Sequence, residues 1–227
     1  MVLSEASDPS FSGRRRGRPV RPTDAPIHRR RCEQIVYREA VDFSEALHFA
    51  RATLGREPNR HITIQWKHAP SPRSVPARLR RILNNTGTLI RRRKGEAAVW
   101  AYCREVGKLK GEHVHILIYV PESMWKEYQK MLRHWLECET DEPVRESAVK
   151  FQNVTPGTVQ TELKGYFLKE GTEQVRFLWV KDRERHKPTG GVIEGKRLKV
   201  SHSIGTSARR AARAEYPLPE TPAIAWR

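Results

Sequence analysis

The segment EHVHILIYV, at positions 112–120, is the most informative stretch of this chain. It is rich in β-branched and aromatic residues, which is typical of a strand, and we expect that strand to run from His113 to Val120. Side chains two positions apart on a strand point to the same face of the sheet. His113 and His115 therefore lie side by side, at a spacing suited to binding one divalent metal ion.

The residues before this segment are expected to form its antiparallel partner. Residues 97–106 again have the composition of a strand, and GKLKG at positions 107–111 is a glycine-flanked loop between the two. Two strands joined by such a loop predict a β-hairpin. The register of this hairpin decides which side chains of the two strands meet.

The hairpin register also determines whether a third ligand joins the two histidines. A loop centred on residue 109 places Glu105 directly opposite His113, and a loop centred on residue 110 places it opposite His115. Opposed residues share a face, with Cβ atoms roughly 5 Å apart, so Glu105 joins both histidines in either case. A loop with an even number of residues would instead place Glu105 opposite Val114 and leave the histidines without a carboxylate.

Two imidazoles and one carboxylate leave coordination positions open for water and substrate. Such a set suits Mg²⁺ or Mn²⁺ acting on a phosphate, and zinc is an alternative. His61 and His68 are candidates for further ligands, without a geometric argument for either. The competing interpretation is a solvent-facing sheet surface on which Glu105, His113 and His115 are ordinary polar residues.

The rest of the chain mixes helices with strands. A hairpin combined with helices, rather than a strict alternation of strand and helix, predicts an α+β fold with an antiparallel sheet and helices on one or both faces. Beyond about residue 181 the sequence is basic and irregular. The expected elements are helices at 42–55, 72–85, 121–138 and 157–170, further strands at 61–66 and 149–154, and a charged turn at 91–94.

The composition favours a polyanionic partner. The 227 residues carry a net charge of +17, with a sequence pI of about 10.3, and such a balance attracts nucleic acid. No apolar run approaches the ~20 residues of a transmembrane helix, and the first residues do not have the pattern of a secretory signal. Three scattered cysteines fit a reducing cytoplasm, where we expect the protein to act, rather than a disulfide framework.

Three regions are expected along the chain. Residues 1–30 form a basic arm too poor in apolar residues to order itself, residues 31–180 form the folded domain with the metal site, and residues 181–227 form a basic, Pro-rich extension. Within the arm, RRRGRP resembles an AT-hook, which lies in a narrow A·T-rich minor groove; an arm that binds any phosphate backbone is the simpler interpretation. The residues expected to contact DNA are Arg14, Arg15, Arg16, Arg18, Arg91, Arg92 and Arg93.

Tyr166 and Lys169 are the candidate catalytic pair outside the hairpin. They fall three positions apart on the expected helix 157–170 and therefore on one side of it. A tyrosine oxygen can attack a phosphodiester, while Lys169 can offset the developing charge or position the tyrosine. The alternative is a tyrosine at the edge of the core beside a solvated lysine.

The order of these motifs resembles that of the HUH endonucleases, in particular of rolling-circle replication initiators with one catalytic tyrosine. The resemblance covers residues 59–171. It rests on an apolar strand at 61–66, the His-hydrophobic-His motif at 113–115 with Glu105 on the preceding strand, and Tyr-x-x-Lys at 166–169. It implies a ferredoxin-like (split βαβ) fold, nicking of single-stranded DNA or an origin hairpin through a covalent 5′-phosphotyrosine, and later strand joining.

The motif order narrows the kinds of HUH endonuclease that the chain resembles, and other features leave different functions open. Relaxases usually carry the tyrosine before the histidine pair, so the order here favours an initiator or a single-tyrosine transposase. The segment GGVIEGKR at 190–197 has P-loop spacing but ends in Arg where Ser or Thr is needed, and a separate host helicase is therefore implied. A 2H-type phosphoesterase, for which His61 and Thr63 supply one of two motifs, and a nucleic-acid-binding protein without catalysis stay open, as does the oligomeric state.

Overall fold

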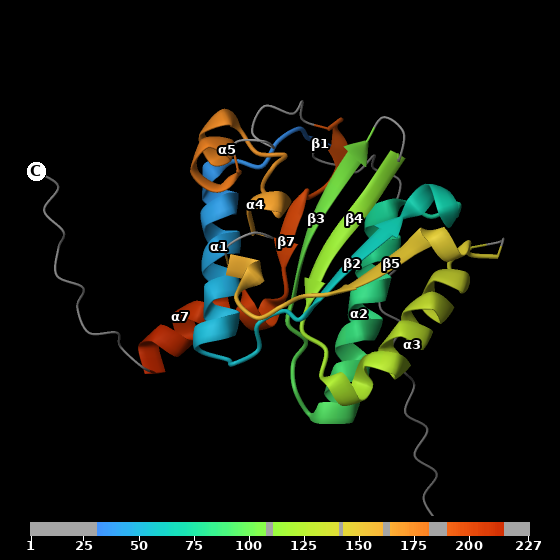
Figure 1. Cartoon of the computed structure of the whole chain (residues 1–227), viewed down its shortest axis with the longest axis horizontal. Coiled ribbons are helices and arrows are strands. Elements are labelled where there is room, and N and C mark those ends of the chain that lie inside the picture. The colour runs from blue at the N-terminus through green and yellow to red at the C-terminus, as the bar shows by residue number, and fades with distance from the viewer. Residues whose placement is uncertain (1–30, 108–110, 141–142, 161–163, 182–189, 216–227) are drawn as a thin grey trace, which may run out of the picture.

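The structure is a computed structural model that describes residues 31–107, 111–140, 143–160, 164–181 and 190–215 (Figure 1). Helices pack on both faces of one central sheet. In chain order the elements are β1 (Arg31–Cys32), α1 (Tyr37–Ala52), β2 (Arg60–Gln65), α2 (Val75–Lys94), β3 (Trp100–Gly107), β4 (Gly111–Ile118), α3 (Trp125–Glu137), β5 (Val149–Asn153), α4 (Lys164–Phe167), α5 (Glu173–Trp179), β6 (Ile193–Glu194), β7 (Leu198–Val200) and α7 (Thr206–Glu215).

The central sheet has five strands in the order β5-β2-β4-β3-β7, and every neighbouring pair is antiparallel. Since β2 and β3 both run antiparallel to β4, they are parallel to each other with β4 inserted between them. The same holds for β4 and β5 around β2. Two interleaved βαβ units result, one through α2 and one through α3, which is the split βαβ arrangement of a ferredoxin-like fold. The expected α+β class is confirmed.

The sheet separates two layers of helices. Figure 1 shows α2 and α3 on one side and α1, α4, α5 and α7 on the other. Strand β4 illustrates why the layers form: Val114 and Ile116 belong to the core under α2 and α3, whereas Leu117 belongs to the core under α1. His113 and His115 share the face of Leu117 because side chains alternate along a strand. Both histidines thus face the α1 side of the sheet.

Helix α1 begins earlier than the sequence suggested. The expected helix ran over 42–55, but α1 spans Tyr37–Ala52. Its first turn is stabilised by Glu39, whose carboxylate accepts a hydrogen bond of 3.3 Å from the backbone N–H of Val36. A glutamate three positions into a helix that reaches back to the start is one half of a capping box.

The expected charged turn at 91–94 is wrong, because these residues form the last turn of α2. The helix ends at Gly95, which has a φ of 72°. Glycine adopts this left-handed conformation without steric cost, so it commonly terminates helices. Four basic residues in the final turn also interact favourably with the negative end of the helix dipole.

The expected long helix at 157–170 is also shorter than predicted. Among the described residues of this segment, the α-helix is α4, Lys164–Phe167. Gly165 lets it lie against α5, because a Cβ atom at this position would come within 2.3 Å of the carbonyl oxygen of Trp179. Leu168, the residue after α4, is fully buried in the core under α1.

Residues 190–215 are not irregular, contrary to the expectation for the chain beyond residue 181. Strand β7 pairs with β3 and completes the central sheet, β6 pairs with β1, and α7 contacts α1. These contacts depend on residues far apart in sequence, which a local pattern does not report. Within the described part of the chain, no helix combines the length and the apolar character that crossing a membrane requires.

Candidate metal centre

The hairpin between β3 and β4 has one of the two registers that bring a carboxylate to the histidines. Glu105 pairs directly with His113, and Gly107 pairs with Gly111. This is the register expected for a connection centred on residue 109. His115 lies two positions along β4 on the same face. The three side chains therefore converge, as predicted for a loop centred on residue 109.

The three side chains form a compact, buried set of ligands. Their candidate ligand atoms all lie within 4.8 Å of one another. The Nε2 atom of His113 is 3.4 Å from Oε2 of Glu105, and the Nε2 atom of His115 is 3.7 Å from the same oxygen. Each residue is at most 6% exposed. The competing interpretation of an open, solvent-facing surface is therefore wrong for these three residues.

The geometry fits a single divalent ion. Two atoms bound to one ion at ~2.1 Å each are roughly 3–4 Å apart, which matches the separations between Glu105 and the two histidines. The second carboxylate oxygen, Oε1 of Glu105, is buried and has no hydrogen-bond partner among the described residues. An unpaired buried carboxylate oxygen is costly, and a bound cation would satisfy it.

Hydrogen bonds on the outer side of each imidazole orient the ring. The Nδ1 atom of His113 is 3.1 Å from the carbonyl oxygen of Gly111. Because a carbonyl only accepts hydrogen bonds, Nδ1 carries the proton, and the Nε2 lone pair of the neutral ring is directed towards Glu105. Such a partner for the non-coordinating nitrogen is typical of metal-binding histidines.

His115 is held in the same way by two residues of β2. Its Nδ1 atom is 3.0 Å from Oγ1 of Thr63 and 3.1 Å from Nε2 of His61. Burial, followed by the nearby charge of His115, lowers the pKa of His61 to about 4, so His61 is a neutral imidazole at neutral pH. Burial likewise lowers the pKa of His115. Neutral imidazoles are the form that binds metals.

Glu105 is the negative charge of the centre. Burial alone would raise its pKa, but the neighbouring His113 and His115 and the charge of Lys169 outweigh burial and hold the pKa well below its usual range. The Nζ atom of Lys169 lies 3.0 Å from Oε2 of Glu105. Burial would lower the pKa of Lys169, and the neighbouring Glu105 and Tyr166 raise it instead. Glu105 and Lys169 therefore face each other as an ion pair.

Tyr166 is brought to the edge of this centre by α4. Its hydroxyl is 3.4 Å from Nε2 of His115, and the ammonium group of Lys169 lies 3.9 Å from the centroid of its ring. The side chain is half-buried, and burial raises its pKa. Although Lys169 lies just beyond α4, the structure brings the expected pair together with the expected metal ligands.

His61 and Thr63 were not singled out as supports for a ligand by the sequence. The signal was present, because the strand RHITIQ alternates polar residues with Ile62 and Ile64. His68, the other candidate for an extra ligand, lies elsewhere: its Nδ1 atom is 2.5 Å from Oγ of Ser147.

The arginines expected to contact DNA are not brought to the centre. Arg91, Arg92 and Arg93 end α2, which lies on the opposite face of the sheet, and Arg93 pairs with Glu127 of α3 at 2.6 Å. The four arginines at positions 14–18 lie outside the described residues. A direct role for either cluster in DNA binding stays a prediction.

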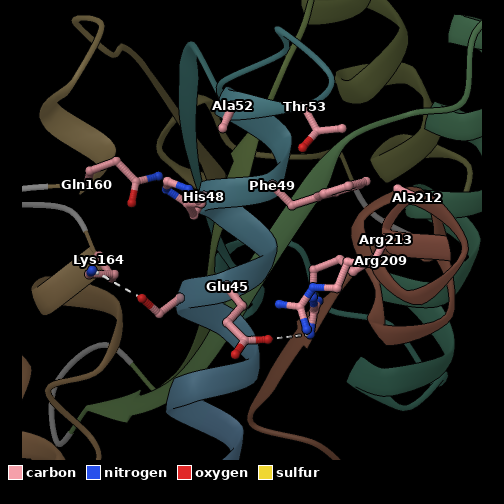
Figure 2. A pocket seen from close by; sticks show the side chains of 11 residues that line it. Glu45, His48, Phe49, Ala52, Thr53, Gln160, Lys164, Arg209, Ala212 and Arg213 are labelled. Atoms are coloured by element: carbon pink, nitrogen blue, oxygen red, sulfur yellow. Dashed lines mark hydrogen bonds and ion pairs between the residues drawn. The ribbon is translucent and has the colours of Figure 1, made fainter. Parts of the chain in front are cut away.

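Two cavities differ in their position relative to the candidate metal centre. One of about 310 Å³ adjoins the centre and is lined in part by His115 and Tyr166. A larger one of about 590 Å³ lies on the outer side of α1, between α7 and the segment that holds Gln160 and Lys164 (Figure 2). None of the expected catalytic or metal-binding residues lines the larger cavity, whereas His115 and Tyr166 line the smaller one.

Comparisons of the chain with protein-family models, with curated proteins and with solved structures find no match. The assignment of the site therefore depends on its geometry. That geometry shows a candidate metal centre of Glu105, His113 and His115 on an antiparallel sheet.

Proposed function

We propose that the protein is a metal-dependent endonuclease that nicks and rejoins single-stranded DNA through Tyr166, in the manner of the HUH endonucleases. One observation carries the proposal: the Tyr166 hydroxyl lies 3.4 Å from a nitrogen of the candidate metal ligand His115. A nucleophile beside a two-histidine, one-carboxylate centre suits attack on a phosphodiester. The net charge of +17 supports a polyanionic substrate.

The reaction divides into two balanced transfers. In the first, the phenol oxygen of Tyr166 attacks the phosphorus, a tyrosine–phosphorus bond forms, and the bond from phosphorus to the 3′ oxygen breaks. The phenol proton leaves to solvent, and the 3′ oxygen takes up a proton. In the second, a 3′ hydroxyl attacks the phosphotyrosine, which restores the phosphodiester and the free tyrosine.

The residues of the centre have separate tasks in this scheme. Glu105, His113 and His115 would hold a Mg²⁺ or Mn²⁺ ion, which when bound polarises the scissile phosphate and offsets its developing charge. Lys169 is close enough to the Tyr166 ring to position the phenol and to favour its ionised form. Burial, which raises the pKa of Tyr166, makes such assistance necessary.

Initiation of rolling-circle replication is the biological role that the motif order favours, and transposition by a single tyrosine would use the same chemistry. Either role requires a single strand or an exposed origin hairpin as substrate. We expect a separate host helicase to provide the single strand, because the P-loop-like segment has Arg197 where a magnesium-binding hydroxyl is needed.

The test is formation of a covalent adduct. The purified protein is incubated with labelled single-stranded DNA and Mn²⁺, and the products are separated on a denaturing gel. We expect a protein–DNA adduct in the parent protein and in Tyr119→Phe, and none in Tyr166→Phe. Tyr119 is a suitable control because it directly follows β4, whose opposite end carries His113.

Two outcomes would contradict the proposal. An adduct that survives in Tyr166→Phe, mapped by mass spectrometry to another residue, would refute the nucleophile. Cleavage without an adduct in either variant would indicate hydrolysis, and would favour the phosphoesterase alternative in which His61 and Thr63 take part.

A further inference from the structure

We propose that the cavity beside Tyr166 binds a nucleobase of single-stranded DNA, next to the phosphate that is cut, and that two glutamine side chains select the base. This inference rests on the proposed function. It assigns a substrate-recognition role to Gln65 of β2 and to Lys150 and Gln152 of the neighbouring edge strand β5. None of these residues belongs to the candidate metal centre.

The first reason is the alternation of side chains along β2. Ile62 and Ile64 are buried in the core under α2 and α3. His61, Thr63 and Gln65 therefore share the other face. This is the face of the metal centre, since β2 pairs Thr63 with His115 on the neighbouring strand β4.

The second reason is the register of the edge strand β5. It pairs Gln152 with His61 and Lys150 with Thr63. Directly paired residues share a face, so both side chains extend the polar surface outward from the centre. Both are exposed, as expected for residues that contact a ligand at the mouth of a site.

The third reason is that the apolar core under α1 does not extend over these two strands. The core under α1 takes sheet residues from β3, β4 and β7, such as Ala101, Leu117 and Leu198, and none from β2 or β5. A cavity of about 310 Å³ lies at the polar side chains of β2 and β5 on this face, with Tyr166 and His115 on its wall. Its volume is at the lower end of the roughly 300–1,000 Å³ typical of small-molecule sites.

The lining chemistry matches a nucleotide. A glutamine amide offers both a donor and an acceptor, and can pair with the edge of an unstacked base. The ammonium group of Lys150 suits the adjoining phosphate, since contacts to phosphates position a strand and contacts to bases specify its sequence. Tyr166 lines the same cavity. A DNA strand whose scissile phosphate lies at the Tyr166 hydroxyl would therefore place a neighbouring nucleotide in the cavity.

The experiment selects bound sequences and needs no cleavage. A pool of single-stranded DNA with randomised positions is bound to Tyr166→Phe protein, and the retained molecules are sequenced. We expect one position with a preferred base. Adding Gln152→Ala or Gln65→Ala should reduce that preference about tenfold, as expected for loss of one good amide–base contact.

Asn153→Ala is the matched control, because Asn153 is the next residue of β5 and points to the opposite face. It should leave the preference unchanged. Lys150→Ala should weaken binding without changing the preferred base, and should reduce the slope of log K against log salt by about 0.7. Circular dichroism and thermal unfolding establish that each variant is folded.

The proposal is overturned if no position shows a preference, or if the preference persists when Gln65 and Gln152 are both replaced by alanine. An equal loss in Asn153→Ala would also overturn it, since the effect would then not belong to this face. Failure of the proposed nicking activity gives a different result: the parent protein forms no adduct, while the selected pool still reports whether the cavity chooses a base.

Discussion

Replacement of Lys169 by methionine should tighten metal binding. The Nζ atom of Lys169 lies 3.0 Å from Oε2 of Glu105, and the same oxygen faces both histidines. A divalent ion bound to that oxygen and the lysine ammonium are two cations on one carboxylate. Without the ammonium group, the metal ion no longer competes with a second cation for the carboxylate of Glu105. Methionine keeps the length and apolar stem of lysine and removes its charge.

The size of the effect follows from the geometry. An ion bound to Oε2 at ~2.1 Å lies within roughly 5 Å of Nζ. A single and a double positive charge at that distance repel by ~1.7 kcal/mol in bulk water and by several-fold more at an effective dielectric constant of about 20. Since the lysine side chain is 19% exposed and can turn to solvent, the lower value applies. We expect Mn²⁺ to bind at least about tenfold more tightly.

Isothermal titration of Mn²⁺ into each protein measures this change directly. Lys164→Met is the matched control: Lys164 belongs to α4, but its Nζ donates a hydrogen bond of 3.1 Å to Oγ of Ser44 rather than facing Glu105. Its affinity for Mn²⁺ should equal that of the parent. Nicking by Lys169→Met should be slower despite the tighter metal binding. An unchanged or weaker Mn²⁺ affinity in Lys169→Met would refute the reasoning that the ion binds this oxygen.

Four further outcomes are expected. Glu105→Ala should abolish measurable Mn²⁺ binding in calorimetry, because His113 and His115 alone are a weak pair of ligands, and retained affinity would place the ion elsewhere. Thr63→Val should weaken Mn²⁺ binding by roughly 10–100-fold, as is usual for partners that orient a ligand, and an unchanged affinity would contradict that role. Ile116→Ala should lower the free energy of unfolding by roughly 2–5 kcal/mol in urea titrations, since the side chain is 1% exposed; a loss under 1 kcal/mol would argue against this core. Deletion of residues 1–30 should reduce the slope of log K against log salt for single-stranded DNA by roughly 0.7 per lost phosphate contact, and an equal slope would show that the arm makes none.

The metal centre illustrates which parts of a site local sequence patterns can predict. The period of two along a strand placed His113 and His115 on one face, and that prediction is confirmed. The third ligand depended on the hairpin register, for which the sequence left three alternatives. Only the pairing of β3 with β4 chose the one with Glu105 opposite His113.

The incorrect predictions have two physical origins. Helix ends were misplaced where a cap or a close contact decided them, as at Glu39 for α1 and Gly95 for α2. The strands β6 and β7 were missed because each has at most three residues, too few to show a period. Their partners, β1 and β3, lie far away in the chain.

Sequence patterns were sufficient to predict the α+β class, the strand that carries the two histidines, the candidate ligands and the basic charge. Each of these depends on composition or on the period of a single element, which neighbouring residues set. Only the folded structure shows that Tyr166 and Lys169 lie against Glu105 and His115, that His61 and Thr63 orient a ligand, and that polar side chains of β2 and β5 line a cavity beside Tyr166. These relations join residues some 50 or more positions apart, and such contacts form only when packing of the core brings distant elements to one sheet.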